Sequence, residues 1–386
     1  MRMKYVQVGL SIAALLAGVA VSAPPAQAAE TGPIDLHSLG VRSVAKVIND
    51  RGQVAGHYCI PERSENDNAI PWCRAFRWTE SGGMQALGML GTPASQVTGI
   101  NKDGDVVGWA GAYPNVGQAF VWTPSDGMQS LAPLSQSSGA SGINAKGQVA
   151  GGSEGPSPAA GGFVWTPPHG KHGGSFVEGL GAVCSAINDR GEVVGIYITG
   201  PVQRHAFRWT PSDGLQEIDT LDTVRSTASY ISAKGEVAGI FEKSGESHLF
   251  RWTSAGGMED LGTFGGETQP AGINDHGQIS GFSYTAAGKC RAFRWTESGG
   301  MQDLGTLGGD EAQARGINAR GEVVGWSKTA SGQSHAFRWT EAGGMRDLGT
   351  LGGDNSEAVA INARGQVVGS STTASGDTHA TLWPAS

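Results

Sequence analysis

Four histidines are separated by one or two periods of 43 or 44 residues: His205, His248, His335 and His379. Imidazole is the commonest metal ligand in proteins, so a ring of histidines could bind a metal ion. However, equivalent side chains on neighbouring stacked sheets lie about 10 Å or more apart, whereas the ligands of one ion lie roughly 2 Å from it. We therefore expect structural roles for these histidines at sheet edges, and the sequence predicts no metal and no cofactor.

The segment Asn101-Lys102-Asp103-Gly104-Asp105 contains oxygen-bearing side chains of the kind that bind calcium. A complete calcium site needs further carboxylates that this segment lacks, so we predict a β-turn there. The sequence also contains no Gly-x-Ser-x-Gly elbow, no His-Glu-x-x-His motif and no phosphate-binding loop. It therefore predicts no catalytic residue.

The main break in regularity is an insertion at residues 59–73, because the interval from Asn49 to Asn101 is 52 residues. Loops carry function more often than the scaffold that presents them. Our candidate binding residues are therefore in this insertion: Trp72, Glu62, Glu65 and Asp67. The alternative is a solvated loop without a binding role.

Two cysteines, Cys59 and Cys73, flank this insertion where adjacent strands should leave and re-enter a sheet. We predict a disulfide between them, since an exported protein permits one. Closing a loop of about 15 residues contributes roughly 3 kcal/mol in the chain-entropy model. Cys184 replaces a repeated alanine and should be a small buried residue, and Cys290 has no evident partner.

The positions of eight tryptophans define the repeat that must hold these residues in place. Their spacings are 44, 43, 44, 43, 43, 44 and 44 residues, which is typical of a repeat architecture: Trp78, Trp122, Trp165, Trp209, Trp252, Trp295, Trp339 and Trp383. The tryptophans could form a carbohydrate-stacking surface. Because Phe337 precedes Trp339 by two residues on the same face of a strand, we instead expect a core between repeats.

Each period divides into four short strands, for which residues 314–317, 322–326, 335–339 and 345–348 are one example. No helical periodicity appears outside the N-terminal segment. Four strands in 43–44 residues is the size of a β-propeller blade. The last period stops after its third strand, and residues 34–40 can supply the fourth. We therefore predict an all-β fold, an eight-bladed β-propeller of four-stranded antiparallel blades, closed by strand 34–40.

A four-residue loop between the third and fourth strands would place Thr340 opposite Met345 and Arg338 opposite Asp347. Opposite charges that face each other stabilise a sheet modestly. The same geometry pairs three further residues with an acid: Arg294 with Asp303, Arg251 with Asp260, and Arg208 with Glu217.

Two glycines recur in every period, one in the turn (Gly321) and one inside the second strand (Gly325). The turn glycine tolerates positive φ. Glycine inside a strand suggests a close approach of other atoms, for which we expect a neighbouring blade to be responsible. The residue before the isoleucine of the first strand is usually small, as at Gly316, which suits a crowded innermost strand.

The pattern HAFRWT…GM.DLGTLGG…IN..G.VVG resembles the HAF-type extracellular repeat family of bacterial secreted proteins. The resemblance covers residues 34–383 and matches most closely in the last three periods. It implies an exported repeat protein, and it carries with it no reaction, ligand or catalytic residue.

The first 28 residues have the pattern of a secretory signal peptide: a positive start, an apolar run from Val6 to Ser22, and the cleavage site Ala26-Gln27-Ala28. The alternative is an uncleaved N-terminal anchor. The predicted domains are thus a signal peptide at 1–28 and a β-propeller at 29–386. No second long apolar run follows, so we expect no membrane span after signal removal.

Without Arg2 and Lys4 the chain has 25 basic and 35 acidic residues, a formal charge of −10. Nucleic acid is not an expected partner, because binding to phosphates needs a cluster of lysine and arginine. We expect a secreted or periplasmic monomer that serves as a non-catalytic scaffold for an unknown protein or glycan. The alternative is an enzyme that acts on extracellular polysaccharide or peptide through a site built from several blade loops.

Overall fold

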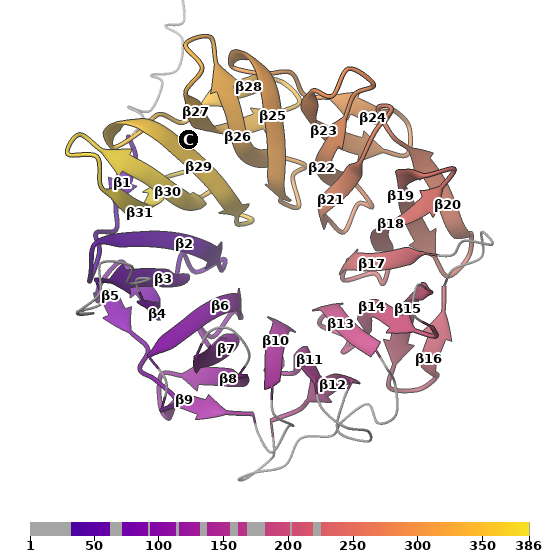
Figure 1. Ribbon diagram of the computed structural model, residues 1–386, viewed down its shortest axis with the longest axis horizontal. Helices are drawn as coiled ribbons and strands as arrows, with labels where there is room; N and C mark the ends of the chain where they lie inside the picture. The colour runs from indigo at the N-terminus through magenta and orange to yellow at the C-terminus, as the bar shows by residue number, and fades with distance from the viewer. Residues whose placement is uncertain are drawn as a thin grey trace, which may run out of the picture. The chain divides into compact units, whose positions relative to one another are not determined.

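The computed structural model describes residues 32–61, 72–91, 93–112, 116–131, 137–154, 161–167, 182–200, 203–218 and 225–385. These residues form strands, turns and bends, and the strands make eight separate antiparallel sheets. The sheets are arranged as the blades of a ring (Figure 1). The predicted all-β, eight-bladed propeller is therefore confirmed. None of the described residues belongs to a helix long and apolar enough to span a membrane.

In blades 1 to 4 the strands follow one another in chain order, and the first strand of each lies nearest the centre of the ring (Figure 1). Blade 1 contains β2 (Arg42–Ile48), β3 (Val54–Ile60), β4 (Trp72–Thr79) and β5 (Gly83–Ala86). Blade 2 contains β6 (Ala94–Ile100), β7 (Val106–Ala112), β8 (Val116–Thr123) and β9 (Gly127–Ser130). Blade 3 contains β10 (Ser137–Ile143), β11 (Val149–Glu154) and β12 (Gly161–Trp165), and its predicted fourth strand lies outside the described residues. Blade 4 contains β13 (Ala182–Ile187), β14 (Val193–Ile198), β15 (Arg204–Thr210) and β16 (Gly214–Glu217).

Blades 5 to 8 repeat the same order. Blade 5 contains β17 (Ser226–Ile231), β18 (Val237–Lys243), β19 (Glu246–Thr253) and β20 (Gly257–Gly262). Blade 6 contains β21 (Thr268–Ile273), β22 (Ile279–Tyr284), β23 (Cys290–Thr296) and β24 (Gly300–Asp303). Blade 7 contains β25 (Gly308–Ile317), β26 (Val323–Thr329), β27 (Ser334–Thr340) and β28 (Gly344–Asp347). Blade 8 contains β29 (Gly352–Ile361), β30 (Val367–Thr373), β31 (Thr378–Trp383) and β1 (Ile34–Asp35).

The ring closes between the two ends of the described chain, as predicted. Strand β1 pairs with β31 and lies beside it in Figure 1. The strand is shorter than the predicted segment 34–40: after Asp35, only the backbone N–H of Leu36 continues the ladder, donating to Ala380 O at 2.9 Å. The Leu36 side chain is 1% exposed and packs in the core between blades 8 and 1.

In most blades, an asparagine side chain in the turn between the first and second strands forms a hydrogen bond to the next blade. The side-chain amide of Asn318 donates to the backbone carbonyl of Asn362 in blade 8 at 3.2 Å. The amide of Asn362 in turn donates to Asn49 O in blade 1 at 3.0 Å, across the closure. Four further junctions carry the same bond: Asn49 to Asn101, Asn144 to Asn188, Asn188 to Ser232, and Asn274 to Asn318. Asn101 occupies the equivalent turn of blade 2, where its Oδ1 accepts hydrogen bonds from the N–H groups of Asp103 and Asp105, in agreement with the predicted β-turn.

The meander gives the ring two different rims. The turns between first and second strands and between third and fourth strands lie on one side, which we call the turn rim. The loops between second and third strands, and the connections from one blade to the next, lie on the other side, the loop rim. Cys59 and Cys73, at the two ends of the insertion, lie where β3 ends and β4 begins, and therefore at the loop rim.

The strand glycines are required by a close approach, but the predicted cause was wrong. Every first strand has a bulge, which in blade 7 lies between Ala314 and Gly316. A Cβ atom on Gly325 would lie 1.9 Å from Gln313 O, which belongs to the bulged strand of the same blade. The crowding thus comes from within each blade rather than from its neighbour.

The predicted register between third and fourth strands was also wrong, by one residue. Thr340 pairs with Gly344 and Phe337 with Asp347, so Arg338 does not face Asp347. The loop has three residues, and Thr340 Oγ1 accepts a hydrogen bond from the Gly343 N–H at 3.0 Å. Because strand side chains alternate between faces, a one-residue change exchanges every cross-strand partner.

The acids of the fourth strands contact the repeated histidines instead. Nδ1 of His335 lies 2.7 Å from Asp347 Oδ2. Three other blades have the same pair: His248 with Asp260 at 2.9 Å, His205 with Glu217 at 3.1 Å, and His379 with Asp35 at 2.8 Å. In blade 8 the acid comes from β1, so this pair also joins the closing strand to the ring. Each histidine lies within one blade with its own acid, which agrees with the structural role predicted for these residues.

The repeated tryptophans and phenylalanines form the core between blades, as predicted. Phe337 and Trp339 are 0% and 4% exposed and pack with Ala292 of blade 6. The guanidinium of Arg294 in blade 6 lies over the Trp339 ring, 5.0 Å from its centroid. Such stacking of a cation on an aromatic face stabilises by about 0.5–2 kcal/mol. Equivalent arginines of blades 1, 4 and 5 stack on the tryptophan of the next blade: Arg77 on Trp122, Arg208 on Trp252 and Arg251 on Trp295.

A buried carboxylate supports the turn rim of blade 7. Glu322 is 8% exposed, and it accepts hydrogen bonds from Arg338 at 2.6 Å, Arg320 at 2.7 Å and Asn318 at 2.6 Å. Burial alone raises the pKa of Glu322, but these three donors outweigh it and hold the pKa below its ordinary value of 4.5. Glu192 in blade 4 has equivalent donors and a pKa that is lowered in the same way.

These carboxylates predict a loss of stability in acid. Their pKa values are lower in the folded than in the unfolded state, so their contribution is complete above pH 4.5 and disappears as pH falls below it. We expect urea unfolding midpoints to decrease between about pH 6 and about pH 3, and to decrease less in a Glu192→Gln, Glu322→Gln double variant. Glu80→Gln, on an exposed turn, is the control and should behave as the parent protein does. Identical acid sensitivity in the double variant and the parent would contradict the assignment.

Candidate binding rim on blade 1

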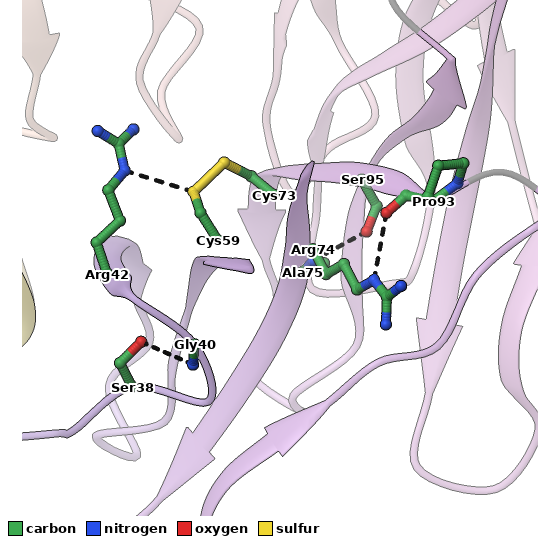
Figure 2. Close-up of a disulfide and its surroundings, with 9 residues drawn as sticks. All are labelled: Ser38, Gly40, Arg42, Cys59, Cys73, Arg74, Ala75, Pro93 and Ser95. Atoms are coloured by element: carbon green, nitrogen blue, oxygen red, sulfur yellow. Dashed lines mark hydrogen bonds between the residues drawn. A yellow bond between two sulfur atoms is a disulfide. The ribbon is translucent and has the colours of Figure 1, made fainter. Parts of the chain in front are cut away.

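The disulfide joins two adjacent strands at the loop rim of blade 1. Cys59 on β3 pairs directly with Cys73 on β4, and their sulfur atoms are bonded, as predicted. Cys59 is fully buried, and Arg42 Nε donates to its Sγ at 3.4 Å (Figure 2). On the other side, Arg74 Nε donates to Pro93 O at 3.3 Å. The base of the insertion is therefore fixed covalently to β3 and β4 and by hydrogen bonds to its surroundings.

Of the predicted binding residues, Trp72 is at this base. It is the first residue of β4, it pairs with Ile60, and both side chains are half-buried. Glu62, Glu65 and Asp67 lie outside the described residues.

An apolar edge, which the sequence did not indicate, continues from this pair onto the connection from β1 to β2. The backbone N–H of Val41 donates to Cys59 O at 2.8 Å. A Cβ atom on Gly40 would lie 3.1 Å from Ile60 Cγ2, so this connection packs directly against the end of β3. Leu39 and Val41 are 47% and 50% exposed. We call Leu39, Val41, Ile60 and Trp72 the apolar rim.

The apolar rim is bordered by positive charge. Arg42, the first residue of β2, is exposed next to Val41, whereas Lys46 is exposed four residues further along the strand, towards the turn rim. His57, 8% exposed, lies two residues before Cys59 on the same face of β3. Burial, together with the charges of Lys46 and Arg42, lowers the pKa of His57 to about 4, so its imidazole is neutral at neutral pH.

His57, Cys59 and Cys73 offer nitrogen and sulfur atoms that lie within 4.8 Å of one another. Thiolates are good ligands for soft metals, but both sulfur atoms are used in the disulfide. In this state the cluster supplies one nitrogen ligand, which does not make a metal centre. Cys184 and Cys290 are unpaired and buried elsewhere, Cys184 as expected for a small core residue.

A cavity of about 320 Å³ near the turn rim is lined by isoleucines and hydroxyl groups of the first strands, among them Ile48, Ile100, Thr98 and Ser141. Among the described residues that line it, none carries a carboxylate or an imidazole. An acid–base pair, which hydrolysis would need, is therefore not provided by these residues.

Comparisons with known proteins support the fold. No known sequence family matches the chain, and no curated protein matches it. Among solved structures it is similar to dipeptidyl peptidase 4 of Porphyromonas gingivalis, with a TM-score of 0.54, 10% identity, and coverage of 92% of this chain and 60% of that one. It is also similar to a puromycin-hydrolyzing peptidase of Mycobacterium tuberculosis, with a TM-score of 0.51, 11% identity, and coverage of 89% and 61%.

A third similar structure is the acylaminoacyl peptidase of Pyrococcus horikoshii, with a TM-score of 0.50, 13% identity, and coverage of 82% of this chain and 53% of that one. The chain thus spans between about half and three fifths of these peptidases. At such low identity the likeness establishes a β-propeller and nothing about activity.

Proposed function

We propose that the protein is an exported, non-catalytic β-propeller of the HAF repeat type that binds another protein through the apolar rim of blade 1. The observation that carries this proposal is the exposure of Leu39 and Val41 beside the disulfide-fixed pair of Ile60 and Trp72. Exposed apolar groups that form one patch with a polar border are characteristic of protein-binding surfaces.

Three further features support this proposal. Disulfides persist in oxidising compartments, which agrees with export to the periplasm or beyond. The disulfide and the neighbouring backbone bonds also hold the apolar rim rigid before binding, which reduces the entropy lost on association. Arg42 at the border favours a partner with acidic groups around an apolar centre.

Site-specific photo-crosslinking tests the proposal in cells that export the full chain. A photoreactive amino acid at Leu39 should give one discrete crosslinked product. The same amino acid at Val183 on blade 4, which is also 47% exposed, is the matched control and should give none. Trp72→Ala should remove the product at Leu39 while secretion and disulfide formation remain unchanged. Equal crosslinking at both positions would refute a specific site, and hydrolysis of a polysaccharide or peptide panel by the purified protein would refute the non-catalytic assignment.

A further inference from the structure

A second cavity lies on the loop rim, between blades 7 and 8. Its volume is about 310 Å³, and its walls come from β26 and β27 of blade 7 and from β29, β30 and β31 of blade 8. The wall residues that matter here are Trp326, Ser334, Asn355, Glu357, Ser370 and Thr378. At roughly 30 Å³ per water molecule the cavity has room for about ten waters. That is the size of a small ligand with one or two rings.

Trp326 gives the cavity an aromatic wall. The side chain is half-buried, and its indole N–H donates to Gln313 Oε1 on the neighbouring strand at 3.2 Å. This bond fixes the ring and satisfies its single donor. What remains for a ligand is an apolar aromatic surface, to which the C–H face of a sugar ring can stack.

The other wall residues provide hydrogen-bonding groups. Glu357 Oε1 accepts from Arg315 Nε at 2.9 Å across the two blades, and a carboxylate has acceptor capacity beyond one such bond. Asn355 Oδ1 accepts from the Ser334 N–H at 3.0 Å, which leaves the amide group of Asn355 as a donor. The hydroxyls of Ser334, Ser370 and Thr378 form no hydrogen bond to another described residue. They can therefore bond to a ligand.

The charge of the cavity restricts the class of ligand. Glu357 is the ionisable residue among those that line it, and Arg315 compensates its charge. An anionic ligand would meet this carboxylate, and a cationic one would have to compete with Arg315. A purely apolar ligand would leave hydroxyl and amide groups without partners, which costs free energy. A neutral polyol with one apolar face can stack on Trp326 and also form hydrogen bonds with these polar groups.

The repeat contains an internal comparison for this arrangement. Trp109 in blade 2 occupies the position of Trp326, but Gly117 replaces Ser334 and Gly139 replaces Glu357. A Cβ atom on Gly117 would lie 3.2 Å from Trp109 Cε3, so the backbone packs against this ring. Trp109 therefore has no neighbours that correspond to the hydroxyl of Ser334 and the carboxylate of Glu357.

We propose that the cavity between blades 7 and 8 binds a neutral saccharide, stacked on Trp326 and hydrogen-bonded by Glu357 and the surrounding hydroxyl and amide groups. This site is independent of the apolar rim on blade 1, so the two proposals can succeed or fail separately.

Isothermal titration calorimetry of the intact exported protein tests the site. The probes are maltose, cellobiose and N,N′-diacetylchitobiose as neutral disaccharides, with digalacturonate as an anionic comparison. We expect at least one neutral probe to bind, and Trp326→Ala to weaken its binding at least tenfold. Glu357→Gln keeps the shape and should weaken binding severalfold. Trp109→Ala is the matched control and should bind as the parent protein does.

Three outcomes would overturn the proposal: binding of none of the neutral probes, tighter binding of digalacturonate, or equal effects of Trp326→Ala and Trp109→Ala. Thermal unfolding of each variant shows whether the ring is intact. If the Trp326→Ala variant does not fold, the test uses the Glu357→Gln variant and saturation-transfer NMR with the same probe. Saturation transfer to the sugar that equals that of the parent protein would then reject the site. Crosslinking at Leu39 should be unaffected by every variant of this cavity.

Discussion

Replacement of Leu36 by alanine should destabilise the whole ring by about 2–5 kcal/mol, the usual cost of truncating a fully buried leucine. Leu36 is 1% exposed and packs with Val54 and Phe76 of blade 1 and Val368 of blade 8. It therefore contributes to the one interface that joins the two ends of the described chain. Chemical denaturation followed by tryptophan fluorescence measures the change.

Leu39→Ala is the matched control, because the same side chain three residues later is 47% exposed. It should change the free energy of unfolding by less than about 0.5 kcal/mol. A mutant that lacks residues 29–40 should show the same effect in its extreme form, with loss of cooperative unfolding or aggregation. If Leu36→Ala and Leu39→Ala were equally stable, closure by this segment would not support the ring.

Gly325→Ala should cost on the order of 3 kcal/mol or more, because backbone rather than a flexible side chain must move. The added Cβ atom would lie 1.9 Å from Gln313 O and 2.9 Å from the Cα atom of Ala314. The bulge in β25 brings these atoms towards the glycine. We expect a lower denaturation midpoint, and a lower yield of folded protein at physiological temperature.

Gly316→Ala, in the same blade, is the control for this prediction. Its Cβ atom would meet nothing closer than Val359 O at 3.6 Å, which is an ordinary contact. Alanine already occupies the equivalent position in two other blades, as Ala186 and Ala360. The variant should therefore be within about 1 kcal/mol of the parent protein. Comparable destabilisation by both substitutions would show that loss of glycine flexibility, and not the bulge, is responsible.

The period of the sequence was sufficient to predict the ring, its eight blades and its closure. The tryptophan spacing sets the blade size, and the segment from Ile34 has the pattern of the strand that the last period lacks. The bulge of each first strand could not be predicted from the period of the repeat. The bulge leaves one residue of the first strand unpaired, and the length of a repeat does not show which of its residues are paired. The sequence therefore showed the repeated strand glycines, but we predicted that a neighbouring blade crowds them, whereas the crowding atoms belong to the first strand of the same blade.

The hairpin error has a similar origin. Whether the loop after Thr340 contains three or four residues decides which side chains face each other, and both lengths fit the same letters. A better signal was available, since the histidine and the acid of each pair lie 12 residues apart in blades 4, 5 and 7. Arginine at the same position, Arg291, likewise lies near an acid, Asp303.

The candidate sites were only partly predictable. The disulfide followed from the placement of Cys59 and Cys73 at the ends of two strands. The role of Leu39 and Val41 depends on how the connection into β2 passes the end of β3, which a sequence does not show. The cavity at Trp326 requires residues from two blades, and Glu357 is 31 residues from Trp326 along the chain.

The hydrogen bond from Asn362 to Asn49 has a consequence for circular permutation of the chain. It is the same amide-to-carbonyl bond, at 3.0 Å, that joins Asn188 to Ser232 and Asn274 to Asn318 in the interior of the chain. The junction between the two ends of the described chain is thus held by the same side-chain bond as several junctions in its interior. A circularly permuted chain that starts at another blade boundary can form every one of these bonds, so the ring does not require any particular blade to come first in the sequence.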